Sequence, residues 1–209
     1  MISRFPVRIR RPFLRKLGIM GAAMIFAACA TGPPLPQVAT PPQRMVQQGY
    51  SFIPLDEKDW YIIGRNEHQV ALAKSGRHAG ETFALQALPF DCPPFDTEDE
   101  FVRFIQEGLS QNTNPQRFKI VVNDASPYHT GGATCVKSHI VKEDHAAVKG
   151  SSRADPMVLD IYSLTCRHPH DASVGVMLTY SQRYYSGQGD PQLGNKATLL
   201  FNSIQFEGF

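Results

Sequence analysis

The sequence predicts an α+β fold, a single domain in which an antiparallel sheet is covered by two main helices. Short runs of β-branched and aromatic residues come first, and similar runs return between two segments with helical spacing. This order of strands, helix, strands and helix is typical of α+β domains. The loops between the later runs are rich in Gly, Asp, Pro and His, so an antiparallel meander is the simplest connection.

Four strands are expected before the first helix. Each is a short run enriched in aromatic, branched or alternating apolar residues, and proline closes the first and the last of them. These strands are expected at residues 50–53, 60–63, 69–73 and 82–90.

The first helix is expected to begin after Thr97. Thr97 and Glu100 have the spacing of a capping box, and Glu98 and Asp99 suit the positive end of a helix dipole. The helix should end between Asn112 and Pro115, and its apolar face should consist of Phe101, Phe104, Ile105 and Leu109.

Further strands and a final helix are expected in the rest of the chain. The strands are predicted at residues 117–122, 133–142, 157–166 and 174–184. Asp190 and Pro191 are expected to provide the N-cap and the first turn of the last helix. Its buried face should consist of Leu193, Ala197, Leu200, Phe201 and Ile204.

The first 28 residues have the order of a secretory signal. Six basic residues and no acidic residue precede an apolar run at 17–28. That run is well short of the ~20 residues that span a bilayer as a helix. Paired arginines at Arg10 and Arg11 resemble the twin-arginine export motif, so the export route stays open. Residues 1–28 are therefore predicted to be a signal peptide.

The residues Phe26-Ala27-Ala28-Cys29 resemble the lipobox of bacterial lipoproteins. In that family the signal is cleaved just before the cysteine, whose thiol receives a diacylglyceryl group. The resemblance implies that Cys29 is the lipid-attachment site, and that the protein is held at a membrane by this anchor. Ala30 is not the aspartate that marks inner-membrane retention, so the resemblance implies the outer membrane, facing the periplasm. The alternative is an ordinary cleaved signal in which Cys29 has no role.

Residues 29–49 are predicted to be a lipidated cysteine followed by a proline-rich tether. Five prolines lie between residues 30 and 49, which favours extended polyproline II structure. Such a spacer would reach ~60 Å. The folded domain is then expected at 50–209.

The charge of the mature chain argues against nucleic acid as a partner. Removing residues 1–28 leaves 15 basic and 19 acidic residues, a net charge of −4. The basic character of the full chain therefore belongs to the leader, and no electrostatic footprint for phosphate backbones remains.

The element order resembles the PsbP-like family, which includes bacterial lipoproteins of the DcrB and LpqN type. The resemblance is carried by the segment 49–54 (GYSFIP), by Trp60 shortly after it, and by 199–206 (LLFNSIQF). It implies an α+β domain with a non-catalytic binding or assembly-helper role. No functional residue is transferred, because the matched positions are expected in the core.

With Cys29 assigned to lipid, three cysteines remain for an oxidising compartment. Placing Cys135 opposite Cys166 in a hairpin also aligns apolar positions of the two strands, and the turn then contains Gly, Ser, Asp and Pro. A Cys135–Cys166 disulfide is therefore predicted. Pairing of Cys92 with either one is the alternative.

The sequence contains none of the common catalytic motifs. It has no G-x-S-x-G elbow, no phosphate-binding glycine loop, no H-E-x-x-H and no paired C-x-x-C. We therefore predict no catalytic residue, no cofactor and no metal site, and a binding or assembly role toward envelope proteins or cell-wall components. One alternative is a periplasmic metal-binding protein that uses His168, His170 and Asp171. The other is a hydrolase whose catalytic residues are scattered along the chain.

Overall fold

The structure, a computed structural model, describes residues 34–146 and 156–208. From Leu35 onward the chain forms one unit by its internal contacts. The predicted signal peptide and Cys29, the predicted lipid-attachment site, lie outside the described residues. Within these residues, no helix is long and apolar enough to cross a membrane.

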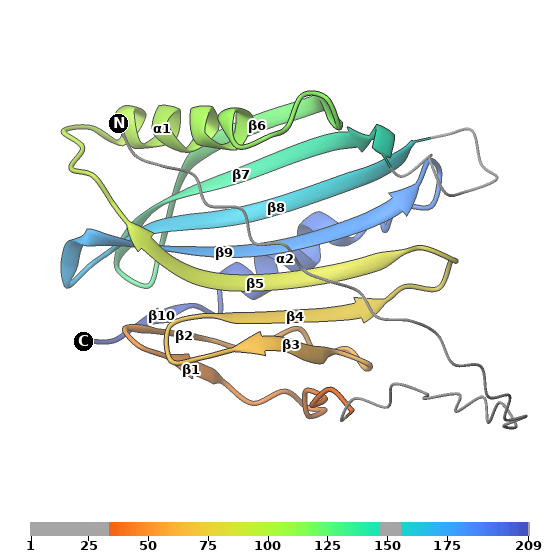
Figure 1. Cartoon of the computed structure of the whole chain (residues 1–209). Coiled ribbons are helices and arrows are strands. Elements are labelled where there is room, and N and C mark those ends of the chain that lie inside the picture. Colours follow the sequence, from red (N-terminus) through yellow and green to blue (C-terminus); the bar gives the residue numbers. More distant parts are fainter. Residues whose placement is uncertain (1–33, 147–155, 209) are drawn as a thin grey trace, which may run out of the picture. The chain divides into compact units, whose positions relative to one another are not determined.

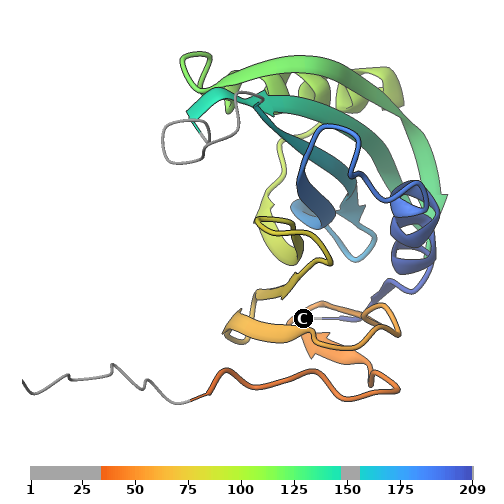
Figure 2. The same cartoon turned by 90° about the vertical axis from the view of Figure 1, so that its right-hand side faces the viewer.

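Seven antiparallel strands form the main sheet, in the order β3-β4-β5-β9-β8-β7-β6 (Figure 1). All of its neighbouring strands pair antiparallel, as predicted. The sheet is strongly curved when viewed from the side (Figure 2). Its strands are β3 (Tyr61–Arg65), β4 (Val70–Ser75), β5 (Thr82–Asp91), β6 (Phe118–Thr130), β7 (Ala133–Asp144), β8 (Met157–His168) and β9 (Asp171–Tyr185).

A second sheet of three short strands joins the two ends of the described chain. β1 (Met45–Gln47) and β10 (Gln205–Phe206) both pair antiparallel with β2 (Tyr50–Phe52). The side chains of Tyr50 and Phe52 are fully buried in the main core. This small sheet therefore closes one side of the core, a role that the sequence analysis assigned to helices.

The two helices pack on opposite faces of the main sheet. Cys135 and Val136 are consecutive on β7, so their side chains point to opposite faces. Val136 packs in a small cluster with α1 (Glu98–Gln111), and Cys135 lies in the main core with α2 (Leu193–Phe201). Figure 1 accordingly shows α1 in front of the sheet and α2 behind it.

The prediction of a sheet covered by two helices is thus confirmed in part. The fold is antiparallel with two helices, but strands dominate it, and the small sheet covers part of the core. The reason is length: α2 has only nine residues and cannot cover a curved sheet of seven strands.

The cap of α1 follows the prediction with one difference. The Thr97 hydroxyl accepts a hydrogen bond from the Glu100 backbone N–H at 3.2 Å. The Glu100 carboxylate accepts from the backbone N–H of Asp96 rather than from that of Thr97. Both interactions satisfy donors near the helix start, where the dipole favours acidic side chains.

Asp190 was wrongly predicted as the N-cap of the last helix. α2 begins at Leu193, with Gln192 in the cap position and no side-chain cap bond. Asp190 instead accepts from the Gln192 backbone N–H at 2.9 Å, which is an Asx-type turn before the helix. The five residues predicted for the buried face are all buried.

The domain starts earlier than the predicted residue 50. Gln37 pairs with Tyr61, the Ile62 N–H donates to the Pro36 carbonyl at 2.8 Å, and β1 lies wholly inside the predicted tether. Prolines can occupy such an edge because the missing N–H is not needed there. The residues from Leu35 onward therefore belong to the folded domain.

β6 is far longer than the predicted strand at 117–122. It continues to Thr130 through Asn, Asp, Ser and Pro, which are residues typical of loops. β6 is an edge strand, where Pro127 costs no ladder hydrogen bond. Pairing with β7 along the whole hairpin overrides the weak local preference.

Candidate functional site

A charged pocket lies where the β4–β5 turn, the segment before β3 and the start of α2 meet. It encloses about 490 Å³, within the usual range for small-molecule sites. Its lining is mainly polar, unlike the apolar lining of most such sites. The charged residues that shape its interior are Glu57, Lys74, Glu81, Asp190 and Lys196.

Four of these side chains form a chain of alternating charge. One carboxylate oxygen of Glu57 forms an ion pair with the Lys74 ammonium group. The other oxygen forms an ion pair with the Lys196 ammonium nitrogen at 2.7 Å. Lys196 also contacts Asp190 at 2.7 Å. Each of these side chains is less than one third exposed, so solvent screens the pairs less than on an open surface.

Gln182 extends this chain into the core. Its side chain is fully buried, and its carbonyl oxygen accepts from the Asp190 N–H at 2.8 Å. Its amide nitrogen donates to Glu81 at 2.6 Å. Glu81 also accepts from the His78 N–H at 3.0 Å, which fixes the β4–β5 turn. A buried amide thus joins both walls of the pocket.

Aromatic rings form the wall behind Lys74. Its ammonium nitrogen lies 5.0 Å from the ring centre of Trp60 and 4.9 Å from that of Phe83. Tyr180 packs against both rings, with centroid separations of 6.2 and 6.3 Å. Among the described residues, neither the Tyr180 hydroxyl nor the Trp60 ring N–H has a hydrogen-bond partner.

The acids of the pocket are held in their ionised form. Burial by itself raises the pKa of Glu57, but the hydrogen bonds and charges of Lys196 and Lys74 outweigh it, so the pKa lies below its usual value. The pKa of Asp190 is lowered in the same way, against burial, mainly by Lys196. Burial also opposes the charge of Lys196, yet its acidic partners raise its pKa.

The rim of the pocket carries charges that this network does not use. Lys58, Asp59 and Arg77 line it and are exposed. In the part of the chain that the structure describes, none of the three forms an ion pair. Asp59 has a φ of 66°, a left-handed conformation that Asp and Asn tolerate better than most residues. Two cationic side chains, Lys58 and Arg77, and one anionic side chain, Asp59, are therefore available to bind a charged ligand.

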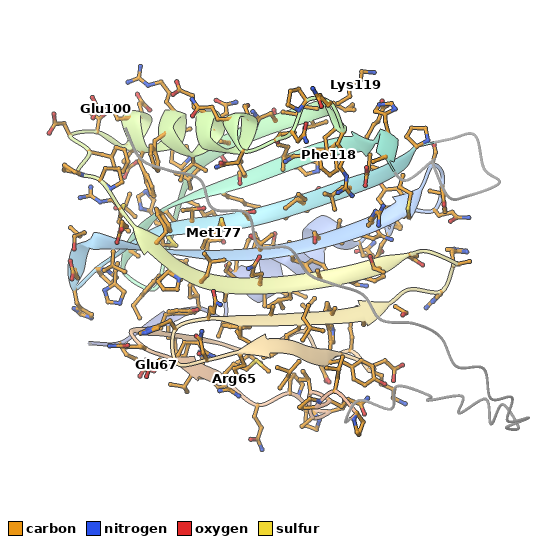
Figure 3. All side chains as sticks on the ribbon, in the orientation of Figure 1. Arg65, Glu67, Glu100, Phe118, Lys119 and Met177 are labelled. Atoms are coloured by element: carbon orange, nitrogen blue, oxygen red, sulfur yellow. A yellow bond between two sulfur atoms is a disulfide. The ribbon has the colours of Figure 1, made fainter. Side chains whose placement is uncertain are left out.

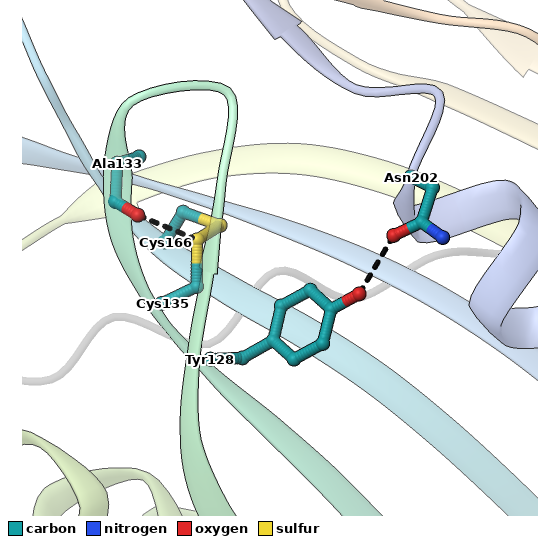
Figure 4. The surroundings of a disulfide bond; sticks show 5 residues. All are labelled: Tyr128, Ala133, Cys135, Cys166 and Asn202. Carbon is teal, nitrogen blue, oxygen red and sulfur yellow. Dashed lines mark hydrogen bonds between the residues drawn. A yellow bond between two sulfur atoms is a disulfide. The ribbon is translucent and has the colours of Figure 1, made fainter.

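The predicted disulfide between Cys135 and Cys166 is present (Figure 4). The two cysteines are directly opposite each other on β7 and β8, as predicted, and the same register pairs His139 with Tyr162 and Ile140 with Ile161. Close by, the Tyr128 hydroxyl donates to the side-chain oxygen of Asn202 at 2.6 Å. This bond links the β6–β7 hairpin to the end of α2.

Cys92 remains a free thiol, buried under α1. Burial raises its pKa, against a smaller opposing effect of Arg167. A thiol held in its protonated form is a weak nucleophile. Cys29, the predicted lipid-attachment site, lies outside the described residues.

The candidate metal ligands in the β8–β9 turn are engaged with the protein itself. His168 is buried, with Nε2 2.7 Å from the Gly49 carbonyl and Nδ1 accepting from the His170 N–H at 3.2 Å. This pattern defines the tautomer with a proton on Nε2 and leaves no ring lone pair for a metal. Asp171 accepts two hydrogen bonds from Ser173. Over the described ranges, no three His, Cys, Asp or Glu side chains are grouped as metal ligands.

Three further histidines, His129, His139 and His145, each face an acidic residue. His139 contacts Asp160 at 2.9 Å and stacks on Tyr162 with centroids 4.1 Å apart, on the sheet. His129 faces Glu98 and His145 faces Glu143, both at 3.5 Å. Each of these histidines has an acidic neighbour of its own, and none of them forms a metal-ligand group with His168 among the described residues.

No protein-family model matches the chain, and no curated protein sequence matches it. Inference about function therefore depends on the residues of this chain.

The pocket residues were missed in the sequence analysis because they lie far apart along the chain. One local signal could have indicated them. Lys74 continues the alternation of Val70 and Leu72 on β4, which places a lysine at a core-facing position. A charge at such a position requires a buried partner, and Glu57 provides it.

Proposed function

We propose that this protein is a lipid-anchored protein of the bacterial envelope whose domain binds a small zwitterionic molecule in the charged pocket. The observation that carries the proposal is the pocket itself, with alternating charges inside and unpaired charges of both signs at its rim. Binding, rather than turnover, is the proposed role.

The proposed envelope location is supported by the leader and by the cysteines. The segment before the domain has basic residues first, then an apolar run, and then small residues directly before Cys29. A disulfide such as Cys135–Cys166 persists in oxidising compartments and is rare in the cytosol. Lipid on Cys29, attachment to the outer membrane and a domain facing the periplasm are parts of the same proposal.

The chemistry of the rim favours a ligand that carries both charges. A carboxylate could pair with Arg77, whose planar guanidinium suits two parallel hydrogen bonds, or with Lys58. An ammonium group could pair with Asp59. Cell-wall stem peptides carry free carboxylates and a free amine on one short chain, so they match this pattern and belong to the same compartment.

The protonation states favour binding over acid–base catalysis. A general acid or base works best when its pKa lies near the working pH. The pKa shifts of Glu57, Asp190 and Lys196 all move away from neutrality. These side chains therefore supply fixed charges, which orient a ligand but do not exchange protons with it.

Calorimetry on the mature chain, residues 29–209, tests the binding role. The probe is the peptide L-alanyl-γ-D-glutamyl-diaminopimelate, and its control is the same peptide with its amines acetylated and its carboxylates amidated. We expect saturable binding of the charged peptide only. Arg77→Gln and Asp59→Asn should each weaken binding at least tenfold, since each removes one rim charge.

Lys119→Gln is the matched control, because Lys119 is an exposed cation on the distant edge strand β6 (Figure 3). It should bind like the wild type. Absence of binding, or equal binding of the blocked peptide, would contradict the zwitterion-binding role.

A further inference from the structure

Fewer residues lie between the predicted lipid site and the folded domain than the sequence predicted, because the domain starts before residue 50. Leu35 is only six residues beyond Cys29, and the chain is part of the fold from there onward. Six extended residues span at most ~20 Å. If Cys29 carries lipid, as the proposed function requires, the part of the domain around Leu35 cannot move far from the bilayer surface.

Exposed apolar side chains gather at this point of the domain. Gln37 pairs antiparallel with Tyr61, and the Ile62 N–H donates to the Pro36 carbonyl, so Leu35 directly precedes the segment that pairs with β3. The exposed fractions are 53% for Leu35, 39% for Tyr61 and 53% for Ile63. An apolar row therefore follows the β3 edge from the place where the chain enters the fold.

The same edge continues onto the small sheet. The Arg65 guanidinium on β3 donates to the Val46 carbonyl on β1 at 3.3 Å, and the Val46 side chain is 53% exposed. Leu35, Val46, Tyr61, Ile63 and Arg65 together are called the anchor-side edge below. Tyrosine and arginine join an apolar part to a polar tip, a combination typical of residues at membrane interfaces.

We propose that the anchor-side edge rests on the surface of the lipid bilayer. The short connection to Cys29 raises the local concentration of this edge at the membrane, so weak individual contacts suffice. The proposal rests on the lipid anchor of the proposed function and adds which surface faces the lipid. Asp59 at the pocket rim is two residues before Tyr61, so the proposal also places the pocket beside the membrane.

Tryptophan reporters on vesicles test this orientation. The mature chain is coupled through Cys29 to a maleimide lipid in vesicles of phosphatidylethanolamine and phosphatidylglycerol, with or without brominated acyl chains. Cys92 is buried and the other two cysteines are oxidised, so Cys29 is the reactive thiol. Ile63→Trp reports on the anchor-side edge, and Trp60 alone gives the background.

Val121→Trp is the matched control, because Val121 is 55% exposed on β6, the opposite edge of the same sheet. We expect brominated lipid to reduce the added emission at least twofold for Ile63→Trp and to leave it unchanged for Val121→Trp. Adding Tyr61→Asp to the Ile63→Trp variant should reverse most of that quenching, since it places a charge in the contact.

Equal quenching at both positions, or quenching that survives Tyr61→Asp, would overturn the proposal. The coupling is chemical, so the result does not depend on whether cells lipidate Cys29. Intact mass of the protein extracted from membranes decides that separate question. Failure of the docking surface and failure of the anchor are therefore told apart.

Discussion

At the scale of single residues, Glu57 is the centre of the charged pocket. Its two carboxylate oxygens serve two different lysines, one of which lies over the Trp60 and Phe83 rings. Removing this charge would leave two ammonium groups close together with Asp190 as their remaining acid. The charge balance of the pocket thus depends on one side chain, which lies in the loop before β3.

We expect Glu57→Gln to lower the free energy of unfolding by about 2 kcal/mol. A hydrogen bond to a charged group contributes ~1.5–3 kcal/mol, and partial exposure keeps the value below that of a fully buried pair. Urea unfolding at pH 7 measures it. Asp56→Asn, at an exposed neighbour, should change stability by no more than ~0.5 kcal/mol. Equal effects of both variants would show that the ion pairs contribute nothing.

Stability should also fall as the pH drops. The pKa values of Glu57 and Asp190 in the folded state lie below their ordinary values of 4.5 and 3.8. Hydrogen bonds from Arg117 lower the pKa of Asp144 in the same direction. Carboxylates of this kind stabilise the fold fully above their unfolded pKa values, and this contribution is lost as the pH falls through the folded ones.

Urea midpoints measured between pH 3 and pH 7 check this expectation. We expect a plateau above about pH 5 and a steady decline below it. The decline should be shallower for Glu57→Gln, which has one fewer group to protonate. A profile that stays flat down to pH 3 would contradict the assignment of these shifts.

At the scale of secondary structure, the β7–β8 pair combines register and covalent chemistry. The predicted pairing of Cys135 with Cys166 is found, because the side-chain period of two permits no slip by one residue without exposing the core face. The disulfide then joins the two strands at buried positions beside α2. Reduction would leave the register intact and remove only the covalent link.

Replacing both Cys135 and Cys166 by serine should lower the free energy of unfolding by ~3–4 kcal/mol. The bond joins residues 31 positions apart, and the chain-entropy model gives this magnitude for such a loop. Thermal unfolding followed by circular dichroism measures the loss. Cys92→Ala is the control, because it removes a cysteine that is not part of the disulfide. It should keep the stability that the bond provides and lose it on reduction, as the wild type does. A double serine variant as stable as the wild type would contradict the prediction.

At the scale of the whole unit, the fold is closed by its own two ends. β1 and β10 flank β2, and the Glu207 N–H donates to the Gly49 carbonyl at 2.9 Å. The Arg44 guanidinium also donates to the Ser203 carbonyl at 2.9 Å. The segment before residue 50 therefore holds the C-terminal end in place.

Truncation tests this role directly. A chain that starts at residue 34 should keep the thermal midpoint of the chain 29–209. A chain that starts at residue 50 loses β1 and the Arg44 contacts and uncovers the buried Met45 site, so it should melt at least 10 °C lower or fail to fold. Equal midpoints would restore the predicted boundary at residue 50.

The sequence by itself determined the local features that depend on pattern. Alternating apolar residues located most strands, Thr97 marked the start of α1, and two cysteines at matched positions predicted the pairing that the structure contains, with Cys92 as the open alternative. The leader and Cys29 are also predictions from sequence, and they stay predictions. Each of these depends on neighbours in the chain or on a single hairpin.

Only the tertiary structure decided the pocket, the start of the domain and the exposed edge. Glu57, Lys74, Asp190 and Lys196 come together because the loop before β3, the end of β4 and the start of α2 converge. The strand at 45–47 exists because β2 offers it a partner, and the long β6 exists because β7 does. Contacts between distant segments outweigh local preference in each case, since the free energy of long-range pairing and burial exceeds that of intrinsic propensity.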